Sequence, residues 1–252
     1  MRGTTRFWWR VAAAVVIAAV ALGLGLHEIG AWDPSYEMLV AMVAAGALVA
    51  LATSVEAAVD EYRWGRVEEF RERARAVLSP LLVELEETTG VSTRQLGVSA
   101  YRLRRRLWPF RRPRLERLVR LQLVIRVTSG VAWRTGVGVI GQCVERGADI
   151  VENLAALDEQ LADVSEAEWK TLPSDLTYGL SFREYAKVRG KYGVVLATPI
   201  IKESPLGSRV IGCISVDAPE DAFDALAADE TRALVAAAAV PLAALLTQVG
   251  LR

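Results

Sequence analysis

The amino-acid sequence predicts an α+β protein in three parts: a transmembrane hairpin of two helices, a connecting helix, and a soluble domain whose antiparallel sheet is flanked by helices. Three observations lead to this prediction. Two long uncharged runs stand near the N-terminus, a helical spacing of apolar residues follows them, and later segments alternate apolar and polar residues. We place the three parts at residues 1–58, 59–90 and 91–252.

Two apolar runs near the N-terminus have the length of membrane spans. Residues 11–26 and 38–55 carry no charged side chain, and the aromatic residues at 7–9 lengthen the first run. The first run then has about the 20 residues that a bilayer requires. Only eleven residues separate the two runs. Because helices satisfy their own backbone hydrogen bonds inside lipid, we expect two helices that cross the membrane out and back.

The flanking charges orient this hairpin. Arginines precede the first run and follow the second, whereas the turn at residues 27–37 holds acids and no lysine or arginine. The positive-inside rule therefore places both termini in the cytoplasm. The abundance of arginine, alanine and valine suggests a high-GC bacterial genome, so the membrane is expected to be a bacterial inner membrane. A cleaved signal peptide is the alternative, but no Ala-x-Ala site follows the first run and a second run appears at once.

A third helix is predicted to connect the hairpin to the soluble domain. Its apolar residues follow 3-4-3-4 spacing and are Val67, Phe70, Ala74, Val77 and Leu81. This spacing is typical of a short coiled coil, and equally of a helix that packs on its own domain. Ser79 and Pro80 interrupt the run, so we expect one helix to end there and another to run from Pro80 to about Gly90.

Strand-like patterns begin after residue 92. Residues 96–103 and 115–127 are expected to form strands joined by a cationic, aromatic tip. A solvated loop is the plain interpretation of this tip, and a tip that rests on the anionic inner leaflet is the functional one. The tip has no recognised nucleic-acid-binding motif, so nucleic acid is not an expected partner. The residues assigned to membrane-surface contact are Arg104, Arg105, Arg106, Trp108, Phe110, Arg111 and Arg112.

The most informative short motif lies at residues 133–143, where a tryptophan precedes Gly136, Gly138 and Gly141. A Gly-x-Gly-x-x-Gly pattern also occurs in dinucleotide sites, where glycines let a pyrophosphate approach a helix N-terminus. We reject a dinucleotide site here. The helix expected at residues 139–146 is short, and an acidic loop follows where a second parallel strand should stand.

The same motif resembles the start of the first core helix of a GAF domain, in which a tryptophan and a Gly-x-Gly lead into an Ile-Gly. Later segments agree with that family in order and spacing. They are a short helix from residue 182, a strand at 194–200 that ends in Pro-Ile, and a strand at 210–217 that ends in Ser-Val-Asp. The resemblance extends over residues 92–250, and the order of the motifs carries it.

The resemblance implies an antiparallel sheet with helices on both sides and a small ligand bound between the sheet and residues 141–191. Members of the family bind cyclic nucleotides, haem or bilins. This chain lacks the Asn-Lys-Phe-Asp-Glu motif of the cyclic-nucleotide binders, and its only histidine, His27, lies in the hairpin turn. The ligand and any cofactor therefore stay unnamed, and no metal site is expected. The candidate ligand-binding residues, which also fit plain core or surface roles, are Trp133, Arg134, Tyr178, Phe182, Tyr185 and Ser215.

Cys143 and Cys213 raise one enzymatic alternative. Some GAF proteins reduce free methionine sulfoxide with cysteines, and a thiolate can be activated without histidine. Both cysteines here are surrounded in sequence by apolar residues and glycines, which favours structural roles. Because cytosolic thiols stay reduced, we expect no disulfide, and we expect no catalysis.

The last predicted helix covers residues 229–249, with an apolar stretch at 233–246 that contains Pro241. That stretch is too short to span a bilayer. We expect the helix to pack against the sheet, or against residues 67–89 of the same or a second subunit.

These features predict a membrane-anchored, homodimeric sensory or regulatory module. It would bind a cytosolic small molecule or a signalling protein and transmit the signal through the connecting helix, without catalysis of its own. No kinase, cyclase or DNA-binding domain follows in the 252 residues, so we expect the output to pass through partners or the membrane spans. A ligand-gated effector that perturbs the bilayer, as in some phage-defence systems, is the alternative.

Overall fold

The computed structural model describes residues 2–104, 113–124, 129–205 and 207–248. It divides into two compact units, Met1–Gly65 and Arg66–Arg252. The first unit consists of α1 (Arg2–Glu28) and the N-terminal part of α2 (Tyr36–Thr89). The second holds the rest of the chain, so residues 66–89 of the predicted connector belong with the soluble domain.

Within the first unit, α1 and α2 pack through glycines. A Cβ atom on Gly23 would collide with the Met42 side chain, and one on Gly46 would lie 3.2 Å from Val20. Small residues allow such close approach of two apolar helices, as is common inside membranes. Among the residues that the structure describes, taking both units together, three helical segments are long and apolar enough to cross a membrane by length and composition alone: Val11–Glu28, Tyr36–Ala58 and Asp229–Gln248.

Helix α2 does not break at Pro80, so that prediction is wrong. The helix continues through the proline to Thr89, and Gly90 follows it with a φ of 70°. A proline inside a helix costs about 3 kcal/mol through the lost hydrogen bond and steric conflict. Leu78 and Leu81, on either side of Pro80, are 0% and 3% exposed, and their burial favours the continuous helix.

The apolar stripe of α2 packs on its own domain. Phe70, Ala74 and Leu78 are all 0% exposed and belong to one core cluster with residues of the sheet. The seam of a coiled coil would need these side chains to face a second helix across a subunit interface. Within the single chain, the structure has the packing on its own domain that the spacing allowed, and the coiled coil between subunits stays a prediction.

The sheet of the second unit has five antiparallel strands in the order β2-β1-β5-β4-β3. This confirms the predicted α+β architecture with an antiparallel sheet flanked by helices. Strand β2 ends at Gln122, earlier than expected, and β3 was missed because its four residues lie in the stretch interpreted as an acidic loop. The strands are β1 (Gly97–Arg104), β2 (Arg114–Gln122), β3 (Ile150–Asn153), β4 (Val194–Lys202) and β5 (Arg209–Ala218).

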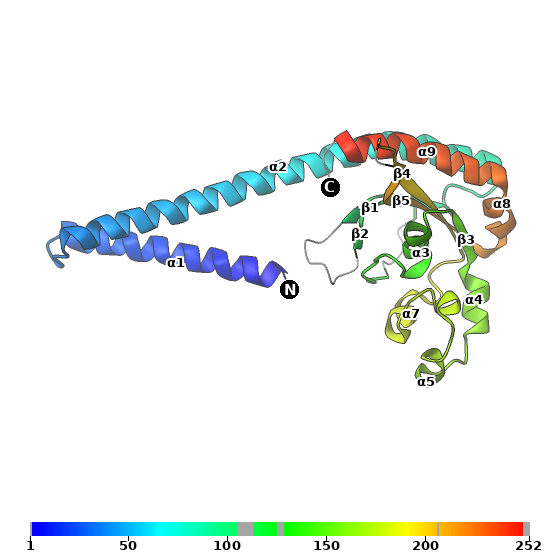
Figure 1. The fold of residues 1–252 in the computed structure, drawn as a ribbon, viewed down its shortest axis with the longest axis horizontal. Coiled ribbons are helices and arrows are strands. Elements are labelled where there is room, and N and C mark those ends of the chain that lie inside the picture. The colour runs from blue at the N-terminus through cyan, green and yellow to red at the C-terminus, as the bar shows by residue number, and fades with distance from the viewer. Residues whose placement is uncertain (1, 105–112, 125–128, 206, 249–252) are drawn as a thin grey trace. The chain divides into compact units, whose positions relative to one another are not determined.

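The two faces of the sheet pack against different helices, because alternate side chains of a strand point to opposite faces. One face packs against α2 and against α9 (Asp229–Gln248), in which Val235 and Leu242 are 0% exposed (Figure 1). The predicted packing of the last helix against the sheet is therefore confirmed. The other face packs against α3 (Gly138–Arg146), and Cys213 of β5 lies in that second cluster.

A helical segment between β3 and β4 covers the α3 side of the sheet. Its small core contains Leu157, Leu161, Trp169 and Tyr185. Ser165 and Ser181 each form a capping box with the glutamate three residues later, which fixes two of the short helices at their N-termini. The helices are α4 (Leu154–Gln160), α5 (Glu166–Trp169), α6 (Ser174–Thr177) and α7 (Phe182–Val188), and after β5 come η1 (Glu220–Ala222) and α8 (Phe223–Ala227).

The predicted membrane-contacting tip falls almost entirely on residues that the structure does not describe. Arg104 is the exception: it ends β1 and lies 3.6 Å from the Glu116 carboxylate, with half of its side chain exposed. Outside the described residues lie Arg105, Arg106, Trp108, Phe110, Arg111 and Arg112.

Candidate functional site

The glycine motif shapes one wall of the site by accommodating the chain itself. Gly138 has a φ of 69°, and a Cβ there would lie 2.5 Å from the Trp133 ring. The Gly138 N–H donates to the carbonyl of Tyr178 at 2.8 Å. A Cβ on Gly141 would collide with the backbone carbonyl of Arg134. These glycines let the chain fold tightly over the N-terminus of α3, so the space that a pyrophosphate would need is filled.

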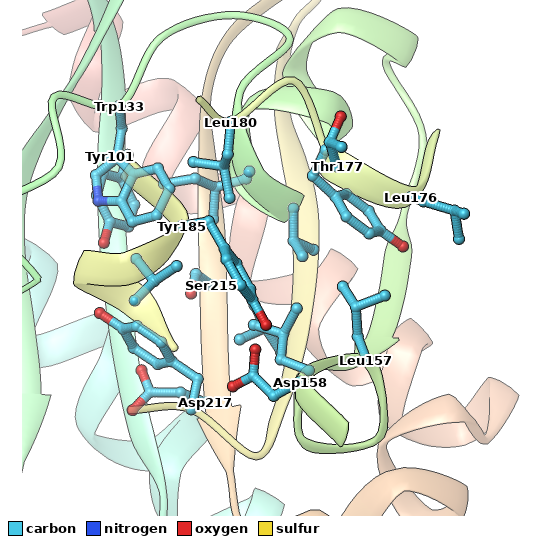
Figure 2. A pocket seen from close by; sticks show the side chains of 18 of the residues that line it. Tyr101, Trp133, Leu157, Asp158, Leu176, Thr177, Leu180, Tyr185, Ser215 and Asp217 are labelled. Atoms are coloured by element: carbon cyan, nitrogen blue, oxygen red, sulfur yellow. The ribbon is translucent and has the colours of Figure 1, made fainter. Parts of the chain in front are cut away.

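A pocket lies between this wall, the sheet and the helical segment. Its lining includes Tyr101 and Ser215 from the sheet, Val139 from α3, Leu157 from α4 and Tyr185 from α7. Figure 2 shows the side chains of Tyr101, Leu157, Tyr185 and Ser215 converging on the pocket from separate elements. The space open to the centre of a water molecule is about 60 Å³. One water needs about 10–15 Å³ on that measure, so the pocket has room for a compact ligand.

An ion pair is built into the wall of the pocket. Arg120 of β2 and Asp217 of β5 are 97 residues apart in sequence, and their side chains meet at 3.1 Å. These side chains are only 15% and 5% exposed. A Cβ on Gly97 would lie 2.5 Å from the Asp217 carboxylate, so the glycine makes room for it. Such a paired, desolvated charge holds two strands and a polar wall in one geometry.

Tyr185 carries the most informative polar group in the pocket. Its ring stacks on Trp169 with centroids 4.4 Å apart, and the residue is 4% exposed. Its hydroxyl points toward the Asp158 carboxylate (Figure 2). Burial, and then hydrogen bonding to that carboxylate, raise the pKa of Tyr185 to about 12, so the phenol stays protonated. The hydroxyl and the carboxylate form a polar pair in the lining of an otherwise largely apolar pocket.

Tyr178 is held in an uncommon backbone conformation beside the pocket. Its φ is 48°, and it is the one non-glycine residue with positive φ among the described parts of the chain. Side chains other than glycine pay a steric cost there, and such positions cluster at binding sites. Burial, and then the Glu152 carboxylate, raise the pKa of the Tyr178 hydroxyl above its usual range.

Four of the six predicted ligand-binding residues line the pocket: Trp133, Tyr178, Tyr185 and Ser215. Phe182 does not. Its ring meets Trp169 edge-on, with centroids 5.9 Å apart, in the small core of the helical segment.

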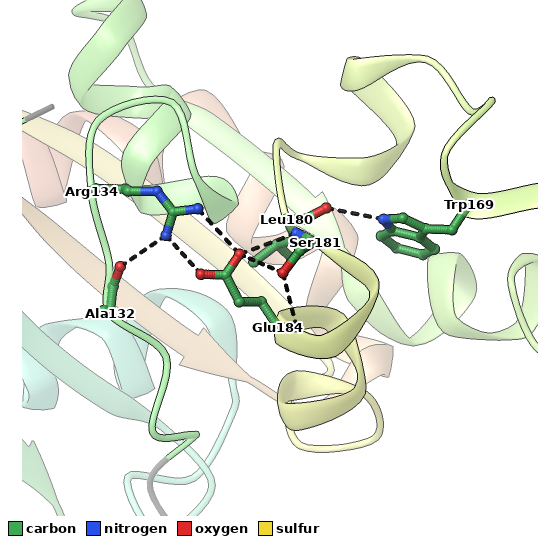
Figure 3. Close-up of polar contacts among 6 residues, drawn as sticks. All are labelled: Ala132, Arg134, Trp169, Leu180, Ser181 and Glu184. Carbon is green, nitrogen blue, oxygen red and sulfur yellow. Dashed lines mark hydrogen bonds and ion pairs between the residues drawn. The ribbon is translucent and has the colours of Figure 1, made fainter. Parts of the chain in front are cut away.

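Arg134 also lies outside the pocket lining, in a bidentate ion pair with Glu184. The two guanidinium nitrogens approach the two carboxylate oxygens at 2.7 Å and 3.2 Å (Figure 3). Glu184 is also the capping residue that accepts a hydrogen bond from the Ser181 backbone. Arg134 therefore ties the glycine turn to α7, and it positions the wall of the pocket rather than facing a ligand.

Sequence reasoning missed several lining residues, among them Tyr101, Arg120, Asp158 and Trp169. A local signal existed for Trp169, because the pattern Ser165-x-x-Glu168 marks the start of a helix in the stretch interpreted as loop. Tyr101 and Arg120 lie on strands that the sequence predicted. The sequence did not show that their side chains face the pocket.

The pH dependence of stability should reveal the Arg134–Glu184 pair. Hydrogen bonding to Arg134 outweighs burial and lowers the pKa of Glu184 to about 2. This folded-state pKa lies below the unfolded-state value of about 4.3. The stabilisation of the fold by the Arg134–Glu184 pair is therefore fully present above about pH 4.3 and is lost as the pH falls toward 2. We expect Glu184→Gln to cost about 1 kcal/mol at pH 7.

The difference between wild type and Glu184→Gln should then shrink below pH 4. Thermal unfolding followed by circular dichroism at a series of pH values measures it. A control is Glu166→Gln, whose carboxylate is 64% exposed in its pair with Lys170. A Glu184→Gln difference that is the same at pH 7 and pH 3 would contradict the assignment.

Both cysteines are free and buried on the same face of the sheet. Burial raises the pKa of the Cys143 thiol to about 12, and it raises the pKa of Cys213 well above its usual range. Thiolates are the reactive form of cysteine, and at neutral pH these groups are thiols. Within the described residues, no group of three or more potential ligands could hold a metal ion.

The fold and the site together define an α+β domain with an aromatic-lined pocket on one face of its antiparallel sheet. No family model matches the chain, and no curated protein matches it. Among solved structures, the chain is similar to the GAF domain of a phosphoenolpyruvate-protein phosphotransferase from Acinetobacter. The identity is 13% over 75% of this chain and 94% of that chain, with a TM-score of 0.43.

Two further structures show similar likeness. The first is the GAF domain of a phosphoenolpyruvate-protein phosphotransferase from Coxiella burnetii. The two chains are 16% identical over 76% of this chain and 96% of that chain, with a TM-score of 0.40. An NreA protein from Staphylococcus aureus, mutated in its nitrate-binding site, is 13% identical, covers 59% and 86%, and has a TM-score of 0.35.

Proposed function

We propose that this chain is a membrane-anchored sensory or regulatory module that binds a small molecule in the pocket. The observation that carries the proposal is a cavity of about 60 Å³, lined by aromatic residues, in which the buried Tyr185 hydroxyl faces the Asp158 carboxylate (Figure 2). Ligand sites are typically apolar cavities with a few convergent polar groups, which describes this pocket. The strained backbone of Tyr178 at its edge supports the same conclusion.

Transmission of a signal has a direct route in this proposal. Helix α2 contains both the second apolar run and the stripe around Phe70 that packs on the sheet. A change in the domain that shifts this stripe acts on the same helix that enters the membrane. The proposal includes no cysteine-based catalysis, because both thiols are buried and burial raises the pKa of each.

Filling the pocket should abolish ligand binding and leave the fold intact. Ser215 is 6% exposed on the sheet side of the cavity. We expect Ser215→Leu to occupy the free space and to lower the amount of any co-purifying small molecule at least tenfold. The matched control is Ser208→Leu, at an exposed serine in the β4–β5 turn.

The measurement is mass spectrometry of small molecules released from the full-length protein purified in mild detergent, with circular dichroism to check folding. Retention of the same molecule by folded Ser215→Leu would place the ligand elsewhere. The proposal also fails if wild type carries no small molecule and no member of a chemically diverse compound set raises its melting temperature.

Membrane anchoring is the second part of the proposal. On the helices of the first unit, the side chains of Trp8, Leu22 and Leu48 are 65%, 65% and 67% exposed. Contact between such large apolar side chains and water is unfavourable, so their exposure supports a lipid environment. We expect the full-length protein to stay with vesicles in high salt and in carbonate. We also expect a protease added outside intact cells to leave residues 66–252 undigested. Release from vesicles by carbonate would refute the anchor.

A further inference from the structure

The electric charge of the pocket points to the class of its ligand. Three charged side chains line it: Arg120, Asp158 and Asp217. Arg120 and Asp217 compensate each other in their 3.1 Å ion pair. Asp158 forms no ion pair with any described residue, and its carboxylate accepts a hydrogen bond from the Gly190 backbone N–H at 2.6 Å. The lining therefore carries one net negative charge.

Arg189 is a cation next to Gly190, the residue whose backbone N–H donates to the Asp158 carboxylate. Arg189 is exposed to solvent and is not among the residues that line the pocket. Solvent screens an exposed charge strongly, whereas Asp158 lies partly inside a low-dielectric wall. Arg189 therefore does not remove the need for a positive charge inside the pocket.

Aromatic rings surround the same space. The aromatic residues of the lining are Tyr101, Trp133, Trp169, Tyr178, Tyr185 and Tyr192. Figure 2 shows the hydroxyl of Tyr185 directed at Asp158. The faces of tyrosine and tryptophan rings attract cations, and the attraction strengthens where water is excluded. A carboxylate next to several such rings is the recognition chemistry of an organic ammonium ion.

We propose that the pocket selects a small organic ammonium ion, with its charge against Asp158 and its alkyl groups against the rings of Tyr185 and Trp133. This inference rests on the proposed function, to which it adds the charge and the class of the ligand. The Asp158 carboxylate would repel an anionic ligand. A neutral ligand would bury the carboxylate further without giving it a positive partner, which is unfavourable. The free space of about 60 Å³ suits a compact ion.

The test is isothermal titration calorimetry on the full-length protein in detergent micelles, with three small compounds. Tetramethylammonium is the cation, tert-butanol its neutral counterpart of similar shape, and acetate the anion. We expect tetramethylammonium to bind at least tenfold more tightly than either of the other two. We expect Asp158→Asn, which keeps the shape and removes the charge, to weaken that binding at least tenfold.

The matched control is Asp163→Asn, at an exposed aspartate just after α4, and it should leave the affinity unchanged. Circular dichroism confirms that both variants fold. Binding of acetate or tert-butanol as tightly as tetramethylammonium overturns the inference. So does an unchanged affinity in Asp158→Asn, or the absence of heat from all three compounds.

Failure of this inference can be told from failure of the proposed function. If acetate or tert-butanol binds wild type and Ser215→Leu abolishes that binding, the pocket is a ligand site and only the charge assignment falls. If no compound binds and mass spectrometry finds nothing released from wild type, both conclusions fall.

Discussion

Replacing Phe70 with alanine is expected to destabilise the soluble unit by about 3–5 kcal/mol, the usual cost of deleting a fully buried phenylalanine ring. Phe70 is 0% exposed and belongs to the core shared by α2 and the sheet. The lost ring leaves a cavity that the rigid sheet cannot close. Thermal unfolding of the full-length protein, followed by the near-ultraviolet circular dichroism of its aromatic residues, measures the loss.

The same variant distinguishes packing within the domain from a coiled coil between subunits. If Phe70 belongs to the core of its own domain, Phe70→Ala lowers the melting temperature at every protein concentration. If the stripe joins two subunits, the variant instead dissociates an oligomer and its melting temperature depends on concentration. Val83→Ala is the matched control, because Val83 is 52% exposed on the same helix and should change stability by less than about 0.5 kcal/mol.

Replacing Gly141 with alanine is expected to destabilise the protein by about 2–3 kcal/mol, in the range measured for overpacked cores. Helix propensity alone predicts the opposite sign, because alanine stabilises a helix interior over glycine by about 0.5–1 kcal/mol. Gly141 is buried within α3, and a Cβ there would collide with the backbone carbonyl of Arg134. A backbone group cannot move aside as a flexible side chain can.

Gly65→Ala is the matched control for this substitution. Gly65 lies in α2, and a Cβ there meets no atom within 4 Å. The control should therefore leave stability unchanged or raise it. Equal effects of Gly141→Ala and Gly65→Ala on the melting temperature would show that the tight turn over α3 is absent. Binding measurements on Gly141→Ala at low temperature should also show a weakened pocket, because Trp133 and α3 would separate.

Local patterns were enough to predict most elements of the fold. The uncharged runs correspond to α1 and the first part of α2, and the strand-like runs correspond to β1, β2, β4 and β5. These signals depend on residues a few positions apart, which is the range over which a helix or strand repeats its burial. The four-residue strand β3 is too short to show such a period.

The candidate site was predicted only in part, and the failures have a common reason. Aromatic residues near the glycine motif were correctly placed at the pocket, whereas Arg134 was chosen as its polar contact and Arg120 was overlooked. Arg134 pairs with Glu184, 50 residues away, and Arg120 pairs with Asp217, 97 residues away. Which arginine faces the pocket depends on these distant partners, and no local spacing contains that information.

The sequence by itself determined the element types and the apolar runs, because hydrophobic periodicity and charge are properties of neighbouring residues. Only the tertiary structure decided that the stripe of α2 packs on the sheet of its own domain. Only the tertiary structure also brought the buried Tyr185 hydroxyl to the Asp158 carboxylate inside the pocket. Both outcomes follow from long-range packing, in which a side chain acquires its role from segments that meet it after the chain has folded.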